Sequence, residues 1–174
     1  MPASPTATPE HIKDVNTRYH DAAAHEYDAK WGIDFGATGQ EQVRQKLVKA
    51  LGGNKGANFG QALEIGSGTG YFSLNLLQLG VIEQLTATDI SPGMLSRLAT
   101  TAEGLGLEVK TVRTEAEVLP FADESFDLVF GHAVLHHIPD LERAFAEFQR
   151  VLRPGGAIAF CGEPSRYEIG RAHV

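Results

Sequence analysis

Residues 63–70 read LEIGSGTG, and this segment determines how the rest of the chain is interpreted. Its apolar start predicts a short buried strand over residues 62–65. The glycines at 66, 68 and 70 predict a sharp turn into a helix, because glycine lets backbone N–H groups approach a ligand without a Cβ in the way. Such turns hold nucleotide- or nucleoside-type ligands in α/β folds, and a turn without a ligand is the alternative.

Segments of strand and helix character alternate after this turn. We expect helices over residues 71–79, 91–104 and 141–152, and strands over residues 85–88, 107–112, 126–130 and 157–161. Alternation at this spacing is typical of βαβ units with parallel strands. The sequence therefore predicts an α/β fold with a three-layer, Rossmann-like, doubly wound sheet that is mostly parallel. About five strands are present, so we expect the fold to be incomplete at the C-terminus.

The chain divides into four segments in this interpretation. Residues 1–9 hold three prolines among small polar residues and are expected to be a disordered tail. Residues 10–60 are expected to form a helical lid or cap, with helical patterns over 11–30 and 39–51. Residues 61–162 form the predicted ligand-binding core, and residues 163–174 a tail that we expect to be non-native.

Composition argues against several classes of protein. A net charge of -7 disfavours a broad nucleic-acid surface, since neutralising phosphates needs clustered Lys and Arg. The single cysteine, Cys161, cannot form an internal disulfide, which fits a reducing compartment. No apolar run approaches the roughly 20 residues that span a bilayer, and the first residues lack the features of a secretory signal. We therefore expect a cytoplasmic protein that acts without nucleic acid or membrane.

Two residues beside the glycine turn distinguish between possible ligands. Dinucleotide-binding turns follow G-x-G-x-x-G/A, but the sixth position here is Tyr71, which is too large for close packing of helix on strand. The negative charge of Glu64 would disfavour a pyrophosphate but suit an ammonium or sulfonium group. A nicotinamide-dependent oxidoreductase is therefore the less favoured interpretation.

A second acid, Asp89, ends the next predicted strand, nineteen residues beyond Gly70. A carboxylate at this position accepts hydrogen bonds from the two vicinal hydroxyls of a ribose. The alternative is an N-cap or a loop aspartate. In the ribose interpretation, Ile90 and Met94 form apolar walls beside an adenine.

Four motifs occur in the order and spacing of a known family: LEIGSGTG, TDIS around Asp89, LPFADESFDLV from Leu119, and RVLRPGG over residues 150–156. Together they resemble the class I S-adenosylmethionine-dependent methyltransferases of the small-molecule type, the group that includes ubiquinone and menaquinone C-methyltransferases. The resemblance covers residues 61–161. It implies S-adenosylmethionine as the cofactor and a small organic molecule as the acceptor, and it leaves the acceptor's identity and the oligomeric state open.

The resemblance also implies roles for site residues. Asp89 would hold the ribose, Glu115 and Ala116 would face the adenine, and His132 would line the methionine and sulfonium end. Relatives usually carry Asp at position 115, and Glu is one methylene longer. The full set of expected cofactor-binding residues is Glu64, Gly66, Ser67, Gly68, Gly70, Asp89, Ile90, Met94, Glu115, Ala116, Gly131 and His132.

Three histidines near the predicted site are candidates for a general base: His132, His136 and His137. Histidine titrates near neutrality, as a base requires. The alternative is that the pair at 136–137 serves packing and capping, with a helix starting near Pro139. A base is needed only if the acceptor must lose a proton, because aligning acceptor, methyl and sulfur can supply much of the rate. No metal site is expected, since no ligand set of suitable spacing is complete.

Aromatic residues near the N-terminus are candidates for a lid that packs on the acceptor and excludes water: Tyr19, Tyr27, Trp31 and Phe35. Tyr27 and Trp31 are four residues apart and would share a helix face. The alternative is ordinary core packing. For the function as a whole, the alternative to a methyltransferase is a non-catalytic cofactor-binding fragment, and we expect weak activity from a truncated chain.

Overall fold

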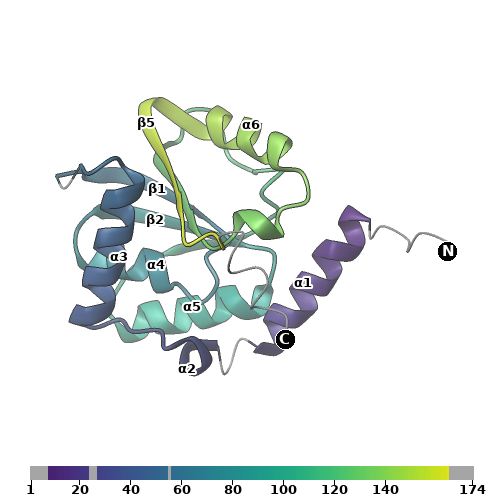
Figure 1. Ribbon diagram of the computed structural model, residues 1–174, viewed down its shortest axis with the longest axis horizontal. Helices are drawn as coiled ribbons and strands as arrows, with labels where there is room; N and C mark the ends of the chain where they lie inside the picture. The colour runs from purple at the N-terminus through teal and green to yellow at the C-terminus, as the bar shows by residue number, and fades with distance from the viewer. Residues whose placement is uncertain (1–7, 24–26, 55, 165–174) are drawn as a thin grey trace.

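A parallel sheet of five strands forms the centre of the molecule (Figure 1). The computed structural model describes residues 8–23, 27–54 and 56–164. Neighbouring strands pair in the order β3-β2-β1-β4-β5, and every pair among the described residues is parallel. The order runs outward from β1 in both directions, which confirms the predicted doubly wound arrangement. The strands are β1 (Phe59–Ile65), β2 (Ile82–Asp89), β3 (Lys110–Arg113), β4 (Phe126–His132) and β5 (Leu152–Cys161).

Helices cover both faces of the sheet, which confirms the three layers (Figure 1). One face carries α3 (Ala37–Ala50), α4 (Tyr71–Gln78) and α5 (Pro92–Gly104), and the other carries α6 (Leu141–Val151). Two helices precede them, α1 (Pro9–Ala23), which packs against α5, and the short α2 (Tyr27–Trp31). Among the described residues, no helix has both the length and the apolar character that crossing a bilayer requires.

The core consists of two apolar clusters, one on each face of the sheet. In β1, Ala62 joins the cluster beneath α3, α4 and α5, whereas Leu63 packs with α6, because side chains alternate along a strand. Phe72 of α4 and Phe148 of α6 are fully buried in these clusters, and each contributes about 1.5–3 kcal/mol by burial. Glu64 interrupts the apolar run at the carboxyl end of β1, although it too is buried. A buried acid within this apolar run indicates a functional site at the carboxyl end of β1.

The ends of some elements differ from the prediction. Residues 154–156 do not form a loop after α6 but lie within β5, which begins directly after the helix. The pairing of β4 with β5 shifts between Phe126 and Leu128, so the extra residues of β5 are taken up as an irregularity. Proline is tolerated at such a position. The third strand starts at Lys110, later than predicted.

Candidate functional site

A cavity of about 830 Å³ lies at the carboxyl ends of β1, β2 and β4. Ligands of doubly wound sheets bind at this edge, where the strand order reverses. The volume is within the range of small-molecule sites. Residues of α1, α2 and α3 also line it, so that it lies between the sheet and the N-terminal helices. The predicted residues that line the cavity are Tyr19, Tyr27, Trp31, Glu64, Gly66, Ser67, Gly68, Asp89, Ile90, Ala116, His132, His136 and His137.

The glycine turn adopts a backbone conformation that other residues rarely take. Gly66 has φ +61°, and a Cβ at this position would lie 2.2 Å from Val134 Cγ2. Gly70 has φ +91° and is the N-cap of α4, where a Cβ would meet Leu74 and Leu98 at 2.9 Å. Both positions therefore require glycine for steric reasons. Gly70 itself lies outside the described cavity lining, so its role is to shape the turn.

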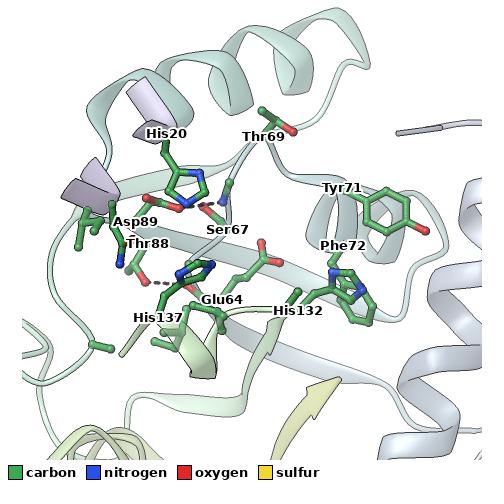
Figure 2. A pocket seen from close by; sticks show the side chains of 18 of the residues that line it. His20, Glu64, Ser67, Thr69, Tyr71, Phe72, Thr88, Asp89, His132 and His137 are labelled. Carbon is green, nitrogen blue, oxygen red and sulfur yellow. Dashed lines mark hydrogen bonds between the residues drawn. The ribbon is translucent and has the colours of Figure 1, made fainter. Parts of the chain in front are cut away.

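Glu64 is the most unusual group in the cavity. Its side chain is 1% exposed, and no hydrogen-bond partner for Oε2 lies among the described residues. Burial, together with the nearby charge of Asp89, raises the pKa of Glu64 to about 8, although the neighbouring Ser73 hydroxyl acts in the opposite direction. Figure 2 shows this carboxyl group between Asp89 and His132. A cation placed in the cavity would restore the ionised form.

Asp89 is held at the end of β2 by backbone N–H groups. Its Oδ2 accepts from the Gly68 N–H at 2.9 Å and its Oδ1 from the Ser91 N–H at 2.8 Å. Burial raises the pKa of Asp89, while these two hydrogen bonds lower it. Each oxygen keeps a further lone pair for a ligand hydroxyl, so the carboxylate is fixed in position for two vicinal hydroxyls.

The structure places some expected adenine contacts elsewhere. Met94 is 1% exposed and packs in the core rather than on the described cavity wall, because it lies on the face of α5 that covers the sheet. Glu115 is half-exposed and lies outside the described lining, with its Oε2 at 2.6 Å from Lys13 Nζ. Glu117 lines the cavity instead, 6% exposed and 3.1 Å from the same nitrogen. Gly131 is buried and lies outside the described lining.

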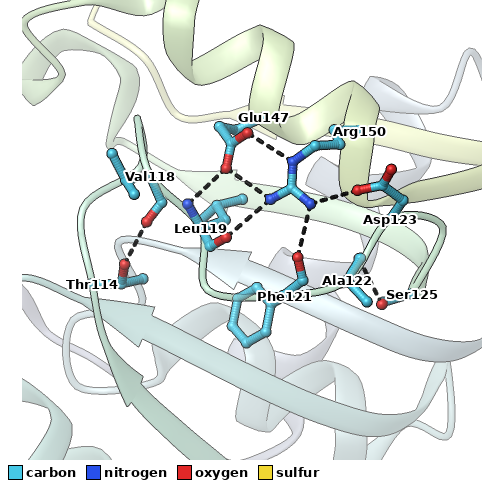
Figure 3. Close-up of polar contacts among 9 residues, drawn as sticks. All are labelled: Thr114, Val118, Leu119, Phe121, Ala122, Asp123, Ser125, Glu147 and Arg150. Atoms are coloured by element: carbon cyan, nitrogen blue, oxygen red, sulfur yellow. Dashed lines mark hydrogen bonds and ion pairs between the residues drawn. The ribbon is translucent and has the colours of Figure 1, made fainter.

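One arginine of α6 holds the segment that carries Glu115 and Ala116. Figure 3 shows Arg150 donating hydrogen bonds to the carbonyl oxygens of Leu119 at 2.9 Å and Phe121 at 2.8 Å. Glu147 accepts from the same guanidinium and from the Leu119 N–H at 2.8 Å, and its pKa is lowered to about 2 by Arg150. The loop after β3 is thereby attached to α6.

The three candidate histidines have different surroundings. His132 stacks on Phe72 with ring centroids 5.2 Å apart, and its Nε2 accepts from Lys46 Nζ at 3.0 Å. Burial and then the charge of Lys46 lower the pKa of His132 to about 4. The Glu163 carboxylate accepts from the N–H groups after β4 and lies 2.8 Å from His136 Nδ1, which supports the packing and capping interpretation for His136.

His137 contacts rings of two other histidines. Its ring centroid lies 4.0 Å from that of His136 and 5.7 Å from that of His20. Desolvation, then His136 and His20, lower the pKa of His137 to about 4. Within the described part of the chain, no group of three His, Cys, Asp or Glu side chains is arranged to hold a metal ion.

The N-terminal helices reach over the cavity and are attached to the core by polar contacts. Asp21 of α1 accepts from Ser91 Oγ at 2.5 Å and from the Gly93 N–H at 3.0 Å, so it caps the start of α5. Tyr19 and Trp31 line the cavity while remaining 52% and 60% exposed, as expected at an entrance. Phe35, in contrast, packs against the core, which corrects the lid prediction for that residue.

A comparison with known families decides what this arrangement is. A family profile described as a methyltransferase domain matches residues 63–160, more than half of the chain. The chain belongs to this methyltransferase family. The match runs from within β1 to within β5 and so includes the ends of β1, β2 and β4 that line the cavity.

Similar proteins carry out several kinds of methyl transfer. The chain is 36% identical over 160 residues to a malonyl-acyl-carrier-protein O-methyltransferase of Methylococcus capsulatus, covering 83% of this chain and 56% of that protein. It is 33% identical over 136 residues to a ubiquinone/menaquinone biosynthesis C-methyltransferase of Desulfotalea psychrophila, covering 78% of this chain and 53% of that protein. The chain thus spans about half the length of these curated relatives.

A solved structure supports the fold of this methyltransferase domain. Phosphoethanolamine N-methyltransferase of Haemonchus contortus, in complex with phosphoethanolamine and S-adenosylhomocysteine, matches with a TM-score of 0.68 and 19% identity. The match covers 88% of this chain and 32% of that one.

Several residues that line the methyltransferase cavity were not selected from the sequence, among them His20, Lys46 and Glu117. Lys46 lies one position before Leu47, which is buried, so its place beside the inward face of α3 is a signal that the helical pattern contains. His20 directly follows Tyr19, which was a lid candidate, and both residues line the cavity from α1. Glu117 lies in a turn closed by an isolated antiparallel β-bridge between Glu115 and Val118. No local sequence pattern predicts that this turn directs Glu117 to the cavity.

Proposed function

We propose that this chain binds S-adenosylmethionine and transfers its methyl group to a small-molecule acceptor. The observation that carries the proposal is the buried carboxyl group of Glu64, whose Oε2 has no hydrogen-bond partner among the described residues. A buried carboxyl oxygen without a partner costs folding free energy unless a bound ligand supplies a hydrogen bond or an opposite charge. The ammonium or sulfonium group of S-adenosylmethionine is such a ligand, whereas the pyrophosphate of a nicotinamide cofactor would add negative charge.

The other lining residues fit the rest of that cofactor. The fixed carboxylate of Asp89 suits the ribose hydroxyls, and Ile90 and Ala116 suit the faces and edge of the adenine. Glu117 faces the cavity where Glu115 does not, so we assign the exocyclic amine of the adenine to Glu117. This is the change that the structure suggests to the set of residues expected from the sequence.

The side chains favour positioning over base catalysis. When bound, S-adenosylmethionine supplies a methyl group on a sulfonium, which is a good leaving group. The pKa values of His132 and His137, both about 4, make these imidazoles neutral but weak bases near neutral pH. The Nε2 of His132 is also engaged by Lys46. The chain's contribution is therefore to align the acceptor with the methyl group and to exclude water.

We assign the exclusion of water to residues 10–60, as a lid over the core of residues 61–162. Tyr19, Tyr27 and Trp31 line the cavity from α1 and α2, so they are placed to contact an acceptor on entry. Contacts to α5 and to the loop after β3 hold α1 over the site. The relatives named for malonyl-acyl-carrier-protein and for quinone synthesis support an organic acceptor of low molecular weight or one carried by a protein.

Calorimetric titration tests cofactor binding. The chain is expected to bind S-adenosylmethionine and S-adenosylhomocysteine and to show no heat with NAD. Asp89→Asn, which keeps the size of the side chain but removes its charge, should weaken binding by roughly 10-fold or more, as expected for hydrogen bonds to a charged group. Binding of NAD in place of the two sulfur compounds would support the oxidoreductase and contradict our proposal.

Methyl transfer is a separate test. Transfer of a labelled methyl group from S-adenosylmethionine to a panel of carboxylates, phenols and amines should identify the acceptor class. Binding of S-adenosylhomocysteine without transfer to any acceptor would favour the non-catalytic alternative.

A further inference from the structure

Lys46 is a cation that reaches the cavity from α3. Its Nζ donates to His132 Nε2 at 3.0 Å and lies 5.3 Å from the centre of the Tyr71 ring. Gln42, one helical turn earlier, lines the cavity beside it and accepts a hydrogen bond from the Tyr71 hydroxyl at 3.1 Å. Lys46, Gln42 and Tyr71 are thus grouped around His132 in the cavity lining. Figure 2 shows His132 and Tyr71 on the side of the cavity away from Asp89.

Among the described residues, no carboxylate oxygen lies within ion-pair distance of Lys46 Nζ. The contrast with Lys13 is direct, since that lysine also lines the cavity but pairs with Glu115 and Glu117. An ammonium group has three N–H donors. In Lys46 one donates to His132 and another faces the Tyr71 ring in a cation–π contact. Lys46 is therefore a partly buried cation with one N–H donor still available and no described carboxylate within ion-pair distance. Such a group is suited to pairing with an anionic ligand.

The geometry points to Lys46 as the cationic contact of a carboxylate subsite at the His132 end of the cavity. A single lysine balances a single negative charge, which suits a carboxylate better than a phosphate dianion. The amide of Gln42 offers a second donor to the same group. This inference rests on the proposed function, because it adds a ligand contact to the same site.

Two sources could supply the carboxylate. One is the methionine part of S-adenosylmethionine, whose ammonium would lie toward Glu64 and whose carboxylate would lie toward Lys46. The other is an acceptor that carries a carboxylate of its own. The two sources predict different ligand dependence for the same substitution.

Lys46→Met tests the subsite, with Lys49→Met as the matched control on the exposed side of the same helix. Calorimetry compares S-adenosylhomocysteine with methylthioadenosine, which lacks the amino-acid part, and titrates malonate into the S-adenosylhomocysteine complex. If the cofactor supplies the carboxylate, Lys46→Met weakens S-adenosylhomocysteine binding roughly 10- to 100-fold and leaves methylthioadenosine unchanged. If the acceptor supplies it, both nucleosides bind as before and Lys46→Met abolishes malonate binding. Lys46→Arg, which keeps the positive charge, should retain most of the binding in either case.

Other results overturn the inference. Equal loss of S-adenosylhomocysteine and methylthioadenosine would assign Lys46 a structural role, and thermal unfolding of both variants identifies that case. An unchanged affinity for S-adenosylhomocysteine, together with no malonate binding that depends on Lys46, would also overturn it. Failure of the unmodified chain to bind S-adenosylhomocysteine would instead contradict the proposed function, so the two failures are distinguishable.

Discussion

The carboxyl group of Glu64 links the stability of the ligand-free protein to pH. Its pKa is raised from 4.5 to about 8 by burial, so the folded chain holds a proton that the unfolded chain releases. The stability from this group is complete below pH 4.5 and is lost as the pH rises through about 8. We expect Glu64→Gln, which is neutral at every pH, to gain stability relative to the unmodified chain across that window, by a few kcal/mol.

Urea unfolding without ligand, repeated from about pH 5 to about pH 9, measures this difference. The same substitution should weaken binding of S-adenosylmethionine, because it removes the charge that faces the cation. A stability difference that does not change with pH would contradict the protonated state of Glu64.

Gly66 and Gly68 form a matched pair for testing the turn. Both have positive φ, at +61° and +53°, but a Cβ on Gly66 would lie 2.2 Å from Val134 Cγ2, whereas a Cβ on Gly68 would meet nothing within 4 Å. Gly68→Ala should therefore cost about 1 kcal/mol from the backbone alone. Gly66→Ala adds a clash and should cost about 2–4 kcal/mol in the free energy of unfolding. Equal losses for the two variants would show that the contact with Val134 is unimportant.

The attachment of the loop after β3 to α6 depends on Arg150. Arg150→Met removes its donors to Leu119 and Phe121 and leaves Glu147 without its cation. We expect a loss of about 2 kcal/mol in stability and faster hydrogen exchange over residues 114–123. Affinity for S-adenosylhomocysteine should also fall, since this loop carries Ala116 and Glu117. Gln149→Met, on an exposed position of the same helix, is the control and should change neither measurement.

The attachment of α1 depends on Asp21. Asp21→Ala removes the acceptor for Ser91 Oγ and the Gly93 N–H and should cost about 1 kcal/mol, as for loss of a helix cap. Hydrogen exchange over residues 9–23 should become faster, and methyl transfer should fall more than cofactor affinity if α1 is a lid. Asp14→Ala, at an exposed position of the same helix, is the control and should leave hydrogen exchange and methyl transfer unchanged. A normal rate of methyl transfer by Asp21→Ala would argue against the lid.

The chain as a whole shows what a sequence specifies locally and what it does not. The alternation of β and α segments, Glu64 and Asp89 were predictable, because strand patterns and strand ends are local features. Met94 was misplaced although it shares the four-residue spacing of Leu98 and Ala102, which predicts burial beneath α5. The position of Met94 is therefore determined by the helical pattern of α5 and not by its closeness in sequence to Asp89.

The remaining site residues come from elements that fold over the sheet. Lys46 lies eighteen residues before Glu64 and meets His132 across 86 positions of sequence. His20 meets His137 in the same way, from α1. No periodicity within one segment fixes such contacts, since they depend on how α1 and α3 pack. The N-terminal division into lid and core stays a prediction, and residues 1–7 and 165–174 lie outside the described residues.

Ligand binding should stabilise the entire chain, because a cavity built from β1, β2, β4 and the N-terminal helices exists only when these elements fold together. At a concentration of S-adenosylhomocysteine about 100 times its Kd, the free energy of unfolding should rise by about 2.7 kcal/mol. For a chain of 174 residues this corresponds to a rise of roughly 5–10 °C in Tm. Differential scanning calorimetry measures the shift, with NAD at the same concentration as the control. A shift confined to one of two separate unfolding transitions would show instead that the N-terminal helices and the core unfold independently, and that the cavity does not require both.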